Sequence, residues 1–315
     1  MDMEDTSKLK IFTGNAHPAL AQEICDYIGV PLGKAVCGRF NNGEIQVMVN
    51  ESVRGKDVFI IQPTGAPVND NLMELLIMVD AMKRASARHI TVIVPYYGYA
   101  RQDRKTRGRE PISAKLVADL LSVAGIDRLI TMDLHADQIQ GFFNIPVDHL
   151  YASAVFLPYI QSLKLDELVI ATPDVGGSKR ASTFSKYLGV PLVLCNKSRE
   201  KANEVASMQI IGDVKGKNVV LIDDIVDTAG TITKAANIML EAGANSVRAI
   251  ASHCVMSDPA SFRVQESGLT EMVFTDSIPY SKKCVKVKQL SIADMFAETI
   301  KRVMNNESIS SQYII

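Results

Sequence analysis

VVLIDDIVDTAGTIT, residues 219–233, is the segment that most strongly indicates the fold. Its first four residues, Val219–Ile222, form an apolar run long enough for a buried strand. Two carboxylates, Asp223 and Asp224, follow directly, and Asp227–Thr231 then supplies small and hydroxyl-bearing side chains ahead of a helical pattern. The segment therefore predicts a buried strand, a short polar loop and a helix in succession.

This order of residues suits the binding of a sugar phosphate. The first turn of a helix presents backbone N–H groups and the positive end of the helix dipole, which together favour a phosphate. The two carboxylates upstream can hold sugar hydroxyls or a hydrated Mg²⁺. The alternative is an ordinary helix cap formed by Asp227 or Thr228, but a cap does not require two carboxylates at the end of the strand. We therefore favour the phosphate-binding interpretation.

Length and composition restrict the possible classes of protein. A chain of 315 residues is too long for one typical core, so two domains are expected. A net charge of −1 argues against a general nucleic-acid or membrane-surface binder. The polar first ten residues lack the apolar core of a signal peptide, and no apolar run approaches the length of a membrane span. The five scattered cysteines contain no CxxC pair, which is typical of free thiols in a reducing compartment, and a cytoplasmic protein is expected.

Apolar runs alternate with helical patterns along the whole chain. This alternation predicts an α/β fold with mainly parallel sheets flanked by helices. The expected strands are Lys10–Thr13, Val58–Ile61, Ile90–Pro95, Leu129–Met132, Leu168–Thr172, Leu192–Leu194, Val219–Ile222, Val247–Ala251 and Met272–Thr275. The expected helices are Pro18–Ile28, Asn69–Ala85, Ile112–Ala124, Ser178–Leu188, Thr231–Ala242 and Ile292–Val303.

The chain also repeats one pattern. The run GKDVFII at Gly55–Ile61 matches GKNVVLI at Gly216–Ile222, and each is followed by a polar loop, a helix and another apolar strand. We interpret them as two copies of one α/β unit joined near Leu150, which gives domains at residues 1–150 and 151–315. Because the match is short, chance similarity between two strand–helix units is the alternative. Only the second copy carries the sugar-phosphate pattern.

A second chemical feature is the basic loop YYGYARQDRKTRGR, residues 96–109. It directly follows the strand expected at Ile90–Pro95, and ligands of α/β proteins bind at the carboxyl ends of such strands. Five arginine and lysine residues in one loop suit a polyphosphate, although a solvated charged loop is the alternative. The chain has no G-x-x-x-x-G-K-[ST] or G-x-G-x-x-G motif, so an ATP site must be built in another way.

Three further polar segments complete the candidate site. His135 lies between Asp133 and Asp137 after an expected strand, where a metal or phosphate role is about as plausible as a structural one. Asp174 in PDVGGSKR can cap a helix, bind a metal, or do both. The polar stretch Arg39–Glu44 (RFNNGE) has the composition of a hairpin turn. The other histidines, His17, His89, His149 and His253, give no comparable indication, and the charged stretch Asn196–Glu204 is expected to be a loop.

Taken together, these motifs resemble the ribose-phosphate diphosphokinase family, over about residues 8 to 311 and in the family's order. The resemblance implies a chain of two duplicated type I phosphoribosyltransferase-like domains. The resemblance implies catalytic roles for Lys197 and Arg199 in a mobile loop, and metal-binding roles for His135 and Asp174. It implies an ATP site at Phe40, Asn42, Glu44, Arg101, Gln102, Asp103 and His135. It implies a ribose 5-phosphate site at Asp223, Asp224, Asp227, Thr228, Ala229, Gly230 and Thr231. It also implies an allosteric anion site at Ser52, Arg54, Lys105, Arg109, Ser308 and Ser310.

The resemblance further implies a reaction and its regulation. The diphosphoryl group of ATP would pass, with Mg²⁺, to the C1 hydroxyl of ribose 5-phosphate, releasing AMP. Inorganic phosphate would activate and ADP would inhibit, in a homo-oligomer built as a hexamer whose ATP site is completed by a neighbouring subunit. Two alternatives stay open: a phosphoribosyltransferase that consumes the diphosphate, and a non-catalytic regulatory homologue. The intact catalytic positions argue against the second, and the ATP-side motifs argue against the first.

Overall fold

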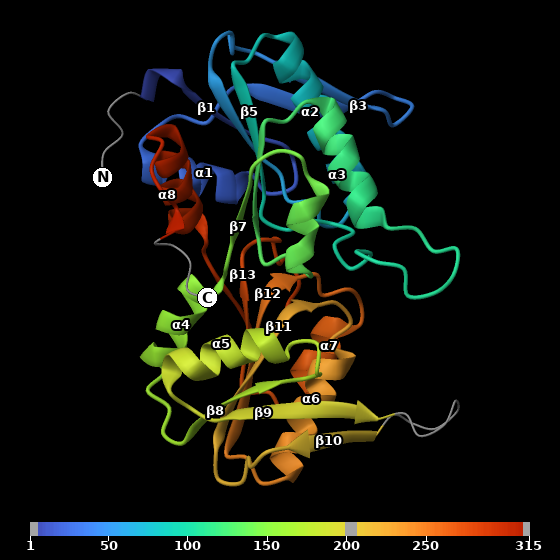
Figure 1. Ribbon diagram of the computed structural model, residues 1–315, viewed down its shortest axis with the longest axis vertical. Helices are drawn as coiled ribbons and strands as arrows, with labels where there is room; N and C mark the ends of the chain where they lie inside the picture. Colours follow the sequence, from blue (N-terminus) through green and yellow to red (C-terminus); the bar gives the residue numbers. More distant parts are fainter. Residues whose placement is uncertain (1–5, 199–206, 311–315) are drawn as a thin grey trace. The chain divides into compact units, whose positions relative to one another are not determined.

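The computed structural model describes residues 6–198 and 207–310, and the described residues form two units, each with its own parallel sheet (Figure 1). The described residues of the first unit fall within Met1–Tyr151, Ser277–Pro279 and Ser291–Tyr313. Those of the second fall within Ala152–Asp276 and Tyr280–Leu290. The expected α/β class is confirmed. In the described ranges no helix is both long enough and apolar enough to cross a membrane.

The first unit is built on a five-stranded parallel sheet of order β1-β4-β5-β6-β7. A separate antiparallel hairpin, β2–β3, precedes β4. The strands are β1 (Leu9–Thr13), β2 (Ala35–Arg39), β3 (Ile45–Val49), β4 (Asp57–Ile61), β5 (His89–Val94), β6 (Arg128–Met132) and β7 (Val147–Leu150). The helices are α1 (Pro18–Ile28), α2 (Val68–Arg84), α3 (Ser113–Ala124), α8 (Ala293–Met304) and the 3₁₀ turns η1 (Thr6–Lys8) and η2 (Asp137–Phe142).

The second unit has a seven-stranded sheet of order β10-β9-β8-β11-β12-β13-β14, in which only the β9–β10 pair is antiparallel. Its strands are β8 (Leu168–Thr172), β9 (Leu192–Ser198), β10 (Ser207–Ile211), β11 (Asn218–Val226), β12 (Ser246–Cys254), β13 (Met272–Thr275) and β14 (Val287–Leu290). Its helices are α4 (Ser153–Ser162), α5 (Ser178–Leu188), α6 (Gly230–Glu241) and α7 (Ala260–Glu266).

The two units are copies of one topology, which confirms the predicted duplication. The order β1-β4-β5-β6-β7 matches β8-β11-β12-β13-β14, and in each unit a helix and a hairpin lie between the first and second of these strands. The matching glycines before β4 and β11 also agree in geometry. Gly55 has φ +67° and donates to the Ser86 carbonyl at 2.9 Å, and Gly216 has φ +70° and donates to the Gly243 carbonyl at 2.8 Å.

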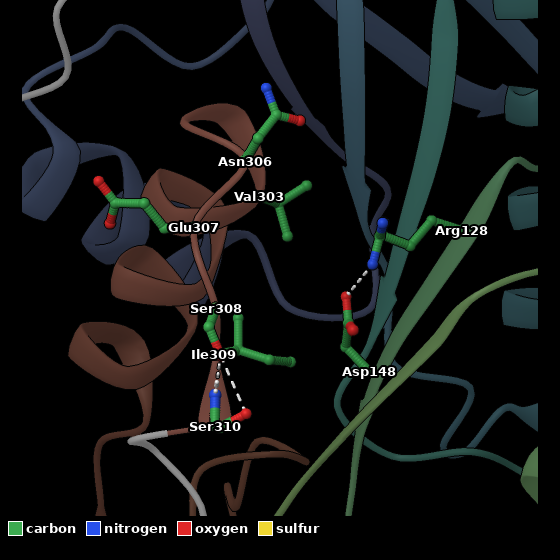
Figure 2. Close-up of a pocket in the computed structure, with 8 residues that line it drawn as sticks. All are labelled: Arg128, Asp148, Val303, Asn306, Glu307, Ser308, Ile309 and Ser310. Carbon is green, nitrogen blue, oxygen red and sulfur yellow. Dashed lines mark hydrogen bonds and ion pairs between the residues drawn. The ribbon is translucent and has the colours of Figure 1, made fainter.

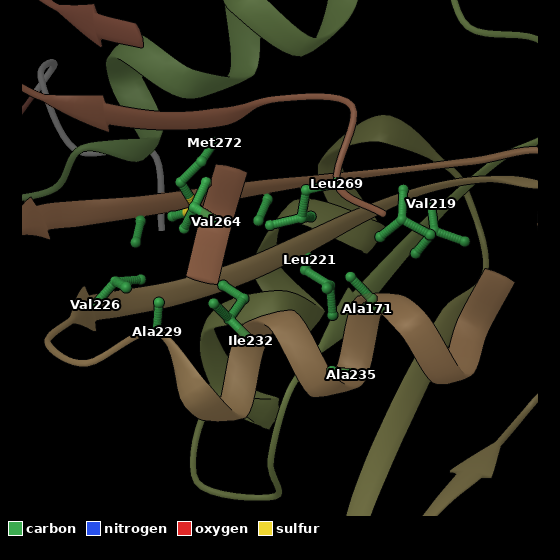
Figure 3. Close-up of a cluster of buried hydrophobic side chains, with 14 of the residues drawn as sticks. Ala171, Val219, Leu221, Val226, Ala229, Ile232, Ala235, Val264, Leu269 and Met272 are labelled. Atoms are coloured by element: carbon green, nitrogen blue, oxygen red, sulfur yellow. The ribbon is translucent and has the colours of Figure 1, made fainter. Parts of the chain in front are cut away.

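Burial on both faces of the sheets explains why the strands are continuous apolar runs. Val219 and Leu221 point to the face covered by α6, where Ile232 and Ala235 pack below them (Figure 3). Successive strand residues alternate between faces, so the buried Val220 points to the opposite side. The apolar run that predicted β11 therefore supplies both layers of the core of the second unit.

The helix that ends the described chain belongs to the first unit. α8 packs against α1, and the Lys301 Nζ atom donates to the Tyr27 carbonyl at 3.3 Å. Ser291 Oγ, just before α8, donates to Glu23 at 2.8 Å. Phe296 of α8 is fully buried. The sequence predicted this helix but gave no sign of the element on which it packs.

Most expected boundaries differ by at most one residue, but the strands β9, β11 and β12 run further than predicted. β11 continues past Ile222 to Val226, because β12 pairs with it to that residue while β8 pairs only as far as Leu221. Asp223 and Asp224 therefore lie within a strand that has lost its neighbour on one side. The loop expected at Asn196–Glu204 is wrong for Asn196–Ser198, which form the end of β9 and pair with β10, and residues 199–204 lie outside the described residues. The helices α4 and α7 and the strands β2, β3, β7, β10 and β14 had not been predicted.

We expect Asp57→Asn to lower the free energy of unfolding by about 2 kcal/mol at pH 7. The Asp57 carboxylate, 9% exposed, accepts from Arg88 Nε at 2.8 Å and lies 2.9 Å from His89 Nδ1. Burial alone would raise the pKa of Asp57, but these hydrogen bonds, that of Arg88 first, hold it below its usual value. A lowered pKa stabilises the fold above the unfolded value and loses that effect as the pH falls through the folded value.

Denaturant unfolding at several pH values would measure this difference, which should shrink as the pH falls below about 4. Asp80→Asn is the matched control, because its ion pair with Arg84 is exposed and should contribute much less to stability. Equal effects of the two substitutions at pH 7 would contradict the expectation.

Candidate functional site

In the first unit, two of the candidate segments leave the same edge of the sheet. β5 and β6 are parallel neighbours, and Thr131 Oγ1 donates to the Val94 carbonyl at 2.7 Å where both strands end. Because parallel strands end at one edge, the loop with Arg101–Asp103 after β5 and the loop with His135 after β6 begin side by side. The structure thus places the two predicted ATP-side segments at one edge of the first sheet.

The basic loop after β5 is held at its base. Tyr97 is 2% exposed and its hydroxyl donates to the Ala114 carbonyl at 3.0 Å. The Gln102 carbonyl accepts from the Ala114 N–H at 3.2 Å, and its side chain accepts from the Ser113 hydroxyl, so Gln102 ties the loop to the start of α3. Asp103 is half-buried, and Arg101 is exposed. The fixed base leaves the cationic side chains directed to solvent.

The turn at Phe40–Glu44 joins β2 to β3, as predicted for a hairpin. Gly43 has φ +90°, a conformation that favours glycine, and its N–H donates to the Phe40 carbonyl at 2.8 Å. Arg39 donates to the Gly43 carbonyl at 3.0 Å and pairs with Asp70 of α2 at 2.8 Å. Phe40 is 51% exposed and Asn42 and Glu44 are exposed. An exposed aromatic ring on a braced turn is suited to stack on a planar base.

The His135 loop contains a residue that the sequence did not single out. His135 itself is exposed, but Leu134 beside it is buried and its N–H donates to His149 Nε2 at 2.8 Å. His149 is 2% exposed. No local pattern indicated this role, because β7 was not predicted and its buried positions do not alternate. His149 therefore joins the candidate site through the backbone of the loop.

In the second unit, the segment predicted to bind phosphate is the connection between β11 and α6. The N-cap of α6 is Ala229, whose side chain offers no acceptor, so neither Asp227 nor Thr228 is the N-cap residue. Ala229 has φ +59° and is buried, while Thr228 and Thr231 are exposed. Asp227 is half-buried. Gly230 begins the helix, so the start of α6 is shaped to receive an anion.

Side chains from elsewhere in the second unit hold this loop. Arg263 of α7 donates to the Thr228 carbonyl at 2.9 Å, and Thr233 Oγ1 donates to the Ala229 carbonyl at 2.7 Å. The Met256 N–H donates to the Val226 carbonyl at 2.9 Å. Arg263 had no sequence signal, because it lies 35 residues beyond Thr228 and on another element. Its guanidinium adds positive charge close to the start of α6.

Three carboxylates influence one another at the carboxyl ends of β8 and β11. Burial first, then the charge of Asp224 and more weakly that of Asp174, raise the pKa of Asp223 well above its usual range. Asp174 Oδ1 accepts from the Gly177 N–H at 3.1 Å, and Gly177 rather than Asp174 is the N-cap residue of α5. A cation near these groups would relieve their repulsion, and carboxylate oxygens are the donors that Mg²⁺ prefers.

Metal geometry is not preformed in the part of the chain that the structure describes: no three His, Cys, Asp or Glu side chains there are grouped as a metal site. His135 and Asp174, the two predicted metal ligands, lie in different units. Arg199 lies outside the described residues. Lys197 is described only by its backbone, which pairs with Met208 in the β9–β10 hairpin.

The predicted allosteric residues fall on three described segments of the first unit. Ser308 and Ser310 follow α8 and line a pocket of about 390 Å³, with the Arg128–Asp148 ion pair of β6 and β7 on the opposite wall (Figure 2). Ser52, Arg54, Lys105 and Arg109 are not among the lining residues, and all four are exposed. Arg54 instead bonds to Ser86 Oγ at 3.1 Å.

Comparison with known proteins gave consistent results. Residues 9–125 match the family described as the N-terminal domain of ribose phosphate pyrophosphokinase, and residues 168–314 match the phosphoribosyl synthetase-associated domain. The chain is 62% identical over 312 residues to a ribose-phosphate pyrophosphokinase of Porphyromonas gingivalis, covering 99% of each chain. It is 56% identical to one of Helicobacter pylori, covering 96% of each. A crystal structure of phosphoribosylpyrophosphate synthetase from Mycobacterium smegmatis superposes with a TM-score of 0.90 at 46% identity, covering 95% of this chain and 100% of that chain.

Proposed function

The chain belongs to the ribose-phosphate pyrophosphokinase family of enzymes, and from that premise we propose that it makes 5-phosphoribosyl 1-diphosphate from ATP and ribose 5-phosphate, releasing AMP. The observation that carries the proposal within the structure is the β11–α6 connection, where paired carboxylates precede a helix N-terminus. A ribose phosphate has hydroxyls at one end and a phosphate at the other, and this segment matches both.

In the proposed reaction the C1 hydroxyl oxygen of the sugar forms a bond to the β-phosphorus of ATP. The bond from that phosphorus to the oxygen shared with the α-phosphate breaks, AMP leaves with this oxygen, and the hydroxyl proton is released. Such a transfer requires aligned substrates and neutralised charge rather than a covalent protein nucleophile. Asp223 and Asp224 orient the ribose hydroxyls, and Thr228–Thr231 hold the 5-phosphate.

On the ATP side, Phe40, Asn42 and Glu44 contact the base, and the Arg101–Asp103 segment contacts the nucleotide. His135 of the first unit and Asp174 of the second would each offer a ligand to Mg²⁺, which would neutralise charge on the polyphosphate. Lys197 and Arg199 stabilise the charge on the transferring diphosphoryl group, as an arginine finger does. The support for these roles is the order of the motifs and, for Arg101–Asp103 and His135, their shared edge of the first sheet.

The proposal predicts that the purified protein, with Mg²⁺, converts ATP and ribose 5-phosphate into equal amounts of AMP and the diphosphate product. Chromatographic separation of the nucleotides and ³¹P NMR of the product would measure both. Nucleotide binding without AMP formation at any phosphate concentration would instead indicate a regulatory homologue. Diphosphate consumption with an added purine or pyrimidine base, and no need for ATP, would indicate a phosphoribosyltransferase.

We also propose that inorganic phosphate activates the enzyme and ADP inhibits it at a second anion site that includes Ser52, Arg54, Lys105, Arg109, Ser308 and Ser310. The proposed assembly is a hexamer in which a neighbouring subunit supplies the Phe40–Glu44 turn to each ATP site. The support for the second site is that its cationic side chains, Arg54, Lys105 and Arg109, are exposed and of a type that binds anions.

For this second site we expect Arg54→Ala to raise the phosphate concentration needed for half-maximal activation by about tenfold, since a charge-assisted hydrogen bond to an anion is lost. Rates measured across a phosphate titration, with light scattering as a check on assembly, would test it. Arg84→Ala is the control, because Arg84 is an equally exposed arginine paired only within α2 to Asp80. An unchanged titration in the Arg54 variant would remove Arg54 from the site.

A further inference from the structure

We infer that His149 is a positioning residue whose Nε2 atom holds the Asp133–His135 loop and so sets the place of His135. The contact itself is independent of the reaction, and only its consequence for MgATP rests on the proposed function. His149 lies on β7, at the edge of the first sheet next to β6, from which the His135 loop emerges. Its imidazole is 2% exposed.

The hydrogen bond from the loop defines the state of the ring. Because the Leu134 N–H donates to His149 Nε2 at 2.8 Å, Nε2 must be unprotonated, and the ring proton of the neutral imidazole is on Nδ1. The Nδ1 atom lies 3.9 Å from Asp137 Oδ1. The Tyr151 ring packs against the imidazole with centroids 4.6 Å apart. The orientation of the ring is thus restricted on three sides.

The backbone of the loop needs such a support. Asp133 is buried at φ +39°, an unfavourable conformation for a residue other than glycine. Its N–H still donates to the Leu150 carbonyl at 3.0 Å, but the regular β6–β7 ladder ends at Met132. Leu134 follows, also buried, and a buried N–H without an acceptor would cost about 1–3 kcal/mol. The acceptor for that N–H is a side chain, His149, and not a strand carbonyl.

His135 comes directly after this bonded amide and is exposed. Residues that orient a metal-binding side chain without touching the metal commonly change the affinity of the site for the metal by 10- to 100-fold. If His135 helps to hold MgATP, loss of the Leu134–His149 bond should weaken MgATP binding while leaving the ribose 5-phosphate segment of the second unit unchanged.

Two substitutions separate the hydrogen bond from the volume of the side chain. His149→Leu fills similar space but has no acceptor, whereas His149→Gln keeps an oxygen that can accept from Leu134. Hydrogen exchange of the peptide spanning residues 131–137, in the full-length protein without nucleotide, should be at least tenfold faster in the Leu variant than in wild type. The Gln variant should remain close to wild type.

The functional arm uses a non-hydrolysable ATP analogue with Mg²⁺ in calorimetry, together with steady-state rates. We expect about tenfold weaker analogue binding and a similar rise in KM for ATP in the Leu variant, with KM for ribose 5-phosphate within twofold of wild type. Equal exchange rates in the His149→Leu and His149→Gln variants would overturn the inference that His149 holds the loop. Parallel losses for both substrates, with a lowered melting temperature, would show general damage and overturn the specific role. The exchange and calorimetry arms stand even if the wild-type protein forms no AMP, so failure of the proposed function is recognised separately.

Discussion

Lys197→Ala is expected to lower kcat on the order of 10³-fold while changing KM for ATP and ribose 5-phosphate by less than about fivefold. The reason is that a cation placed on the transferring group stabilises charge that develops mainly in the transition state, so its loss reduces turnover more than ground-state binding. Arg199→Ala should act in the same direction. Steady-state kinetics with each substrate varied in turn would measure both effects.

Lys215→Ala is the matched control, since it removes an exposed lysine from a turn before β11, at the opposite end of that strand from Asp223 and Asp224. It should keep wild-type rates. A Lys197 variant with turnover within tenfold of wild type would remove Lys197 from the catalytic role. A rise in KM that accounts for the whole loss would assign it to substrate binding instead.

Asp223→Asn is expected to reduce kcat/KM for ribose 5-phosphate by on the order of 10²-fold and at the same time to make the metal-free protein more stable. The loss arises because the carboxylate that orients the ribose hydroxyls becomes a neutral amide. The stability should rise because burial, followed by the charge of Asp224, raises the pKa of Asp223 to about 8, which means that the ionised carboxylate is unfavourable in the folded state and the amide removes it. A site that is strained without its ligands and functional with them is a common compromise in enzymes.

The sign of the stability effect follows from that shift. The folded pKa of Asp223 lies above its unfolded value of about 3.9, so the group costs no stability well below pH 4, and its cost grows as the pH rises from the unfolded to the folded value. Thermal unfolding in chelator should therefore show a higher melting temperature for the Asn variant at pH 9 and a much smaller gain near pH 4.5. Asp166→Asn, at an exposed position in the same unit, should show neither effect. Lower stability of the Asp223 variant at pH 9 would contradict the charge-repulsion account.

Much of the fold could be predicted from local pattern. The helices at Pro18–Ile28 and Ser178–Leu188 were predicted to the residue, because their ends coincide with a proline or polar start and a left-handed glycine after the last turn. The core strands were found because burial on both faces leaves unbroken apolar runs. The repeated GKDVFII and GKNVVLI runs were enough to predict the duplication.

The features that the sequence did not predict depend on pairing between segments that are distant in the chain. The extension of β11 to Val226 comes from its ladder with β12, and polar residues such as Asp223 and Asp224 gave no sign of it. The turn of the β2–β3 hairpin was predicted, but its strands were missed because they are half-exposed and lack the continuous apolar runs of the parallel strands. His149 was set aside as an unremarkable histidine, since its importance comes from a hydrogen bond across two strands that local spacing does not show.

The position of α8 has a consequence for how the protein is made. The helix that packs against α1 in the first unit is synthesised after every strand of that unit's sheet, so residues 9–150 can form their sheet long before this partner of α1 exists. Until then the face of α1 that packs against α8 lacks its cover. Premature termination before Ala293 should therefore yield a chain whose N-terminal half aggregates or recruits chaperones, even though every residue of its sheet has been synthesised.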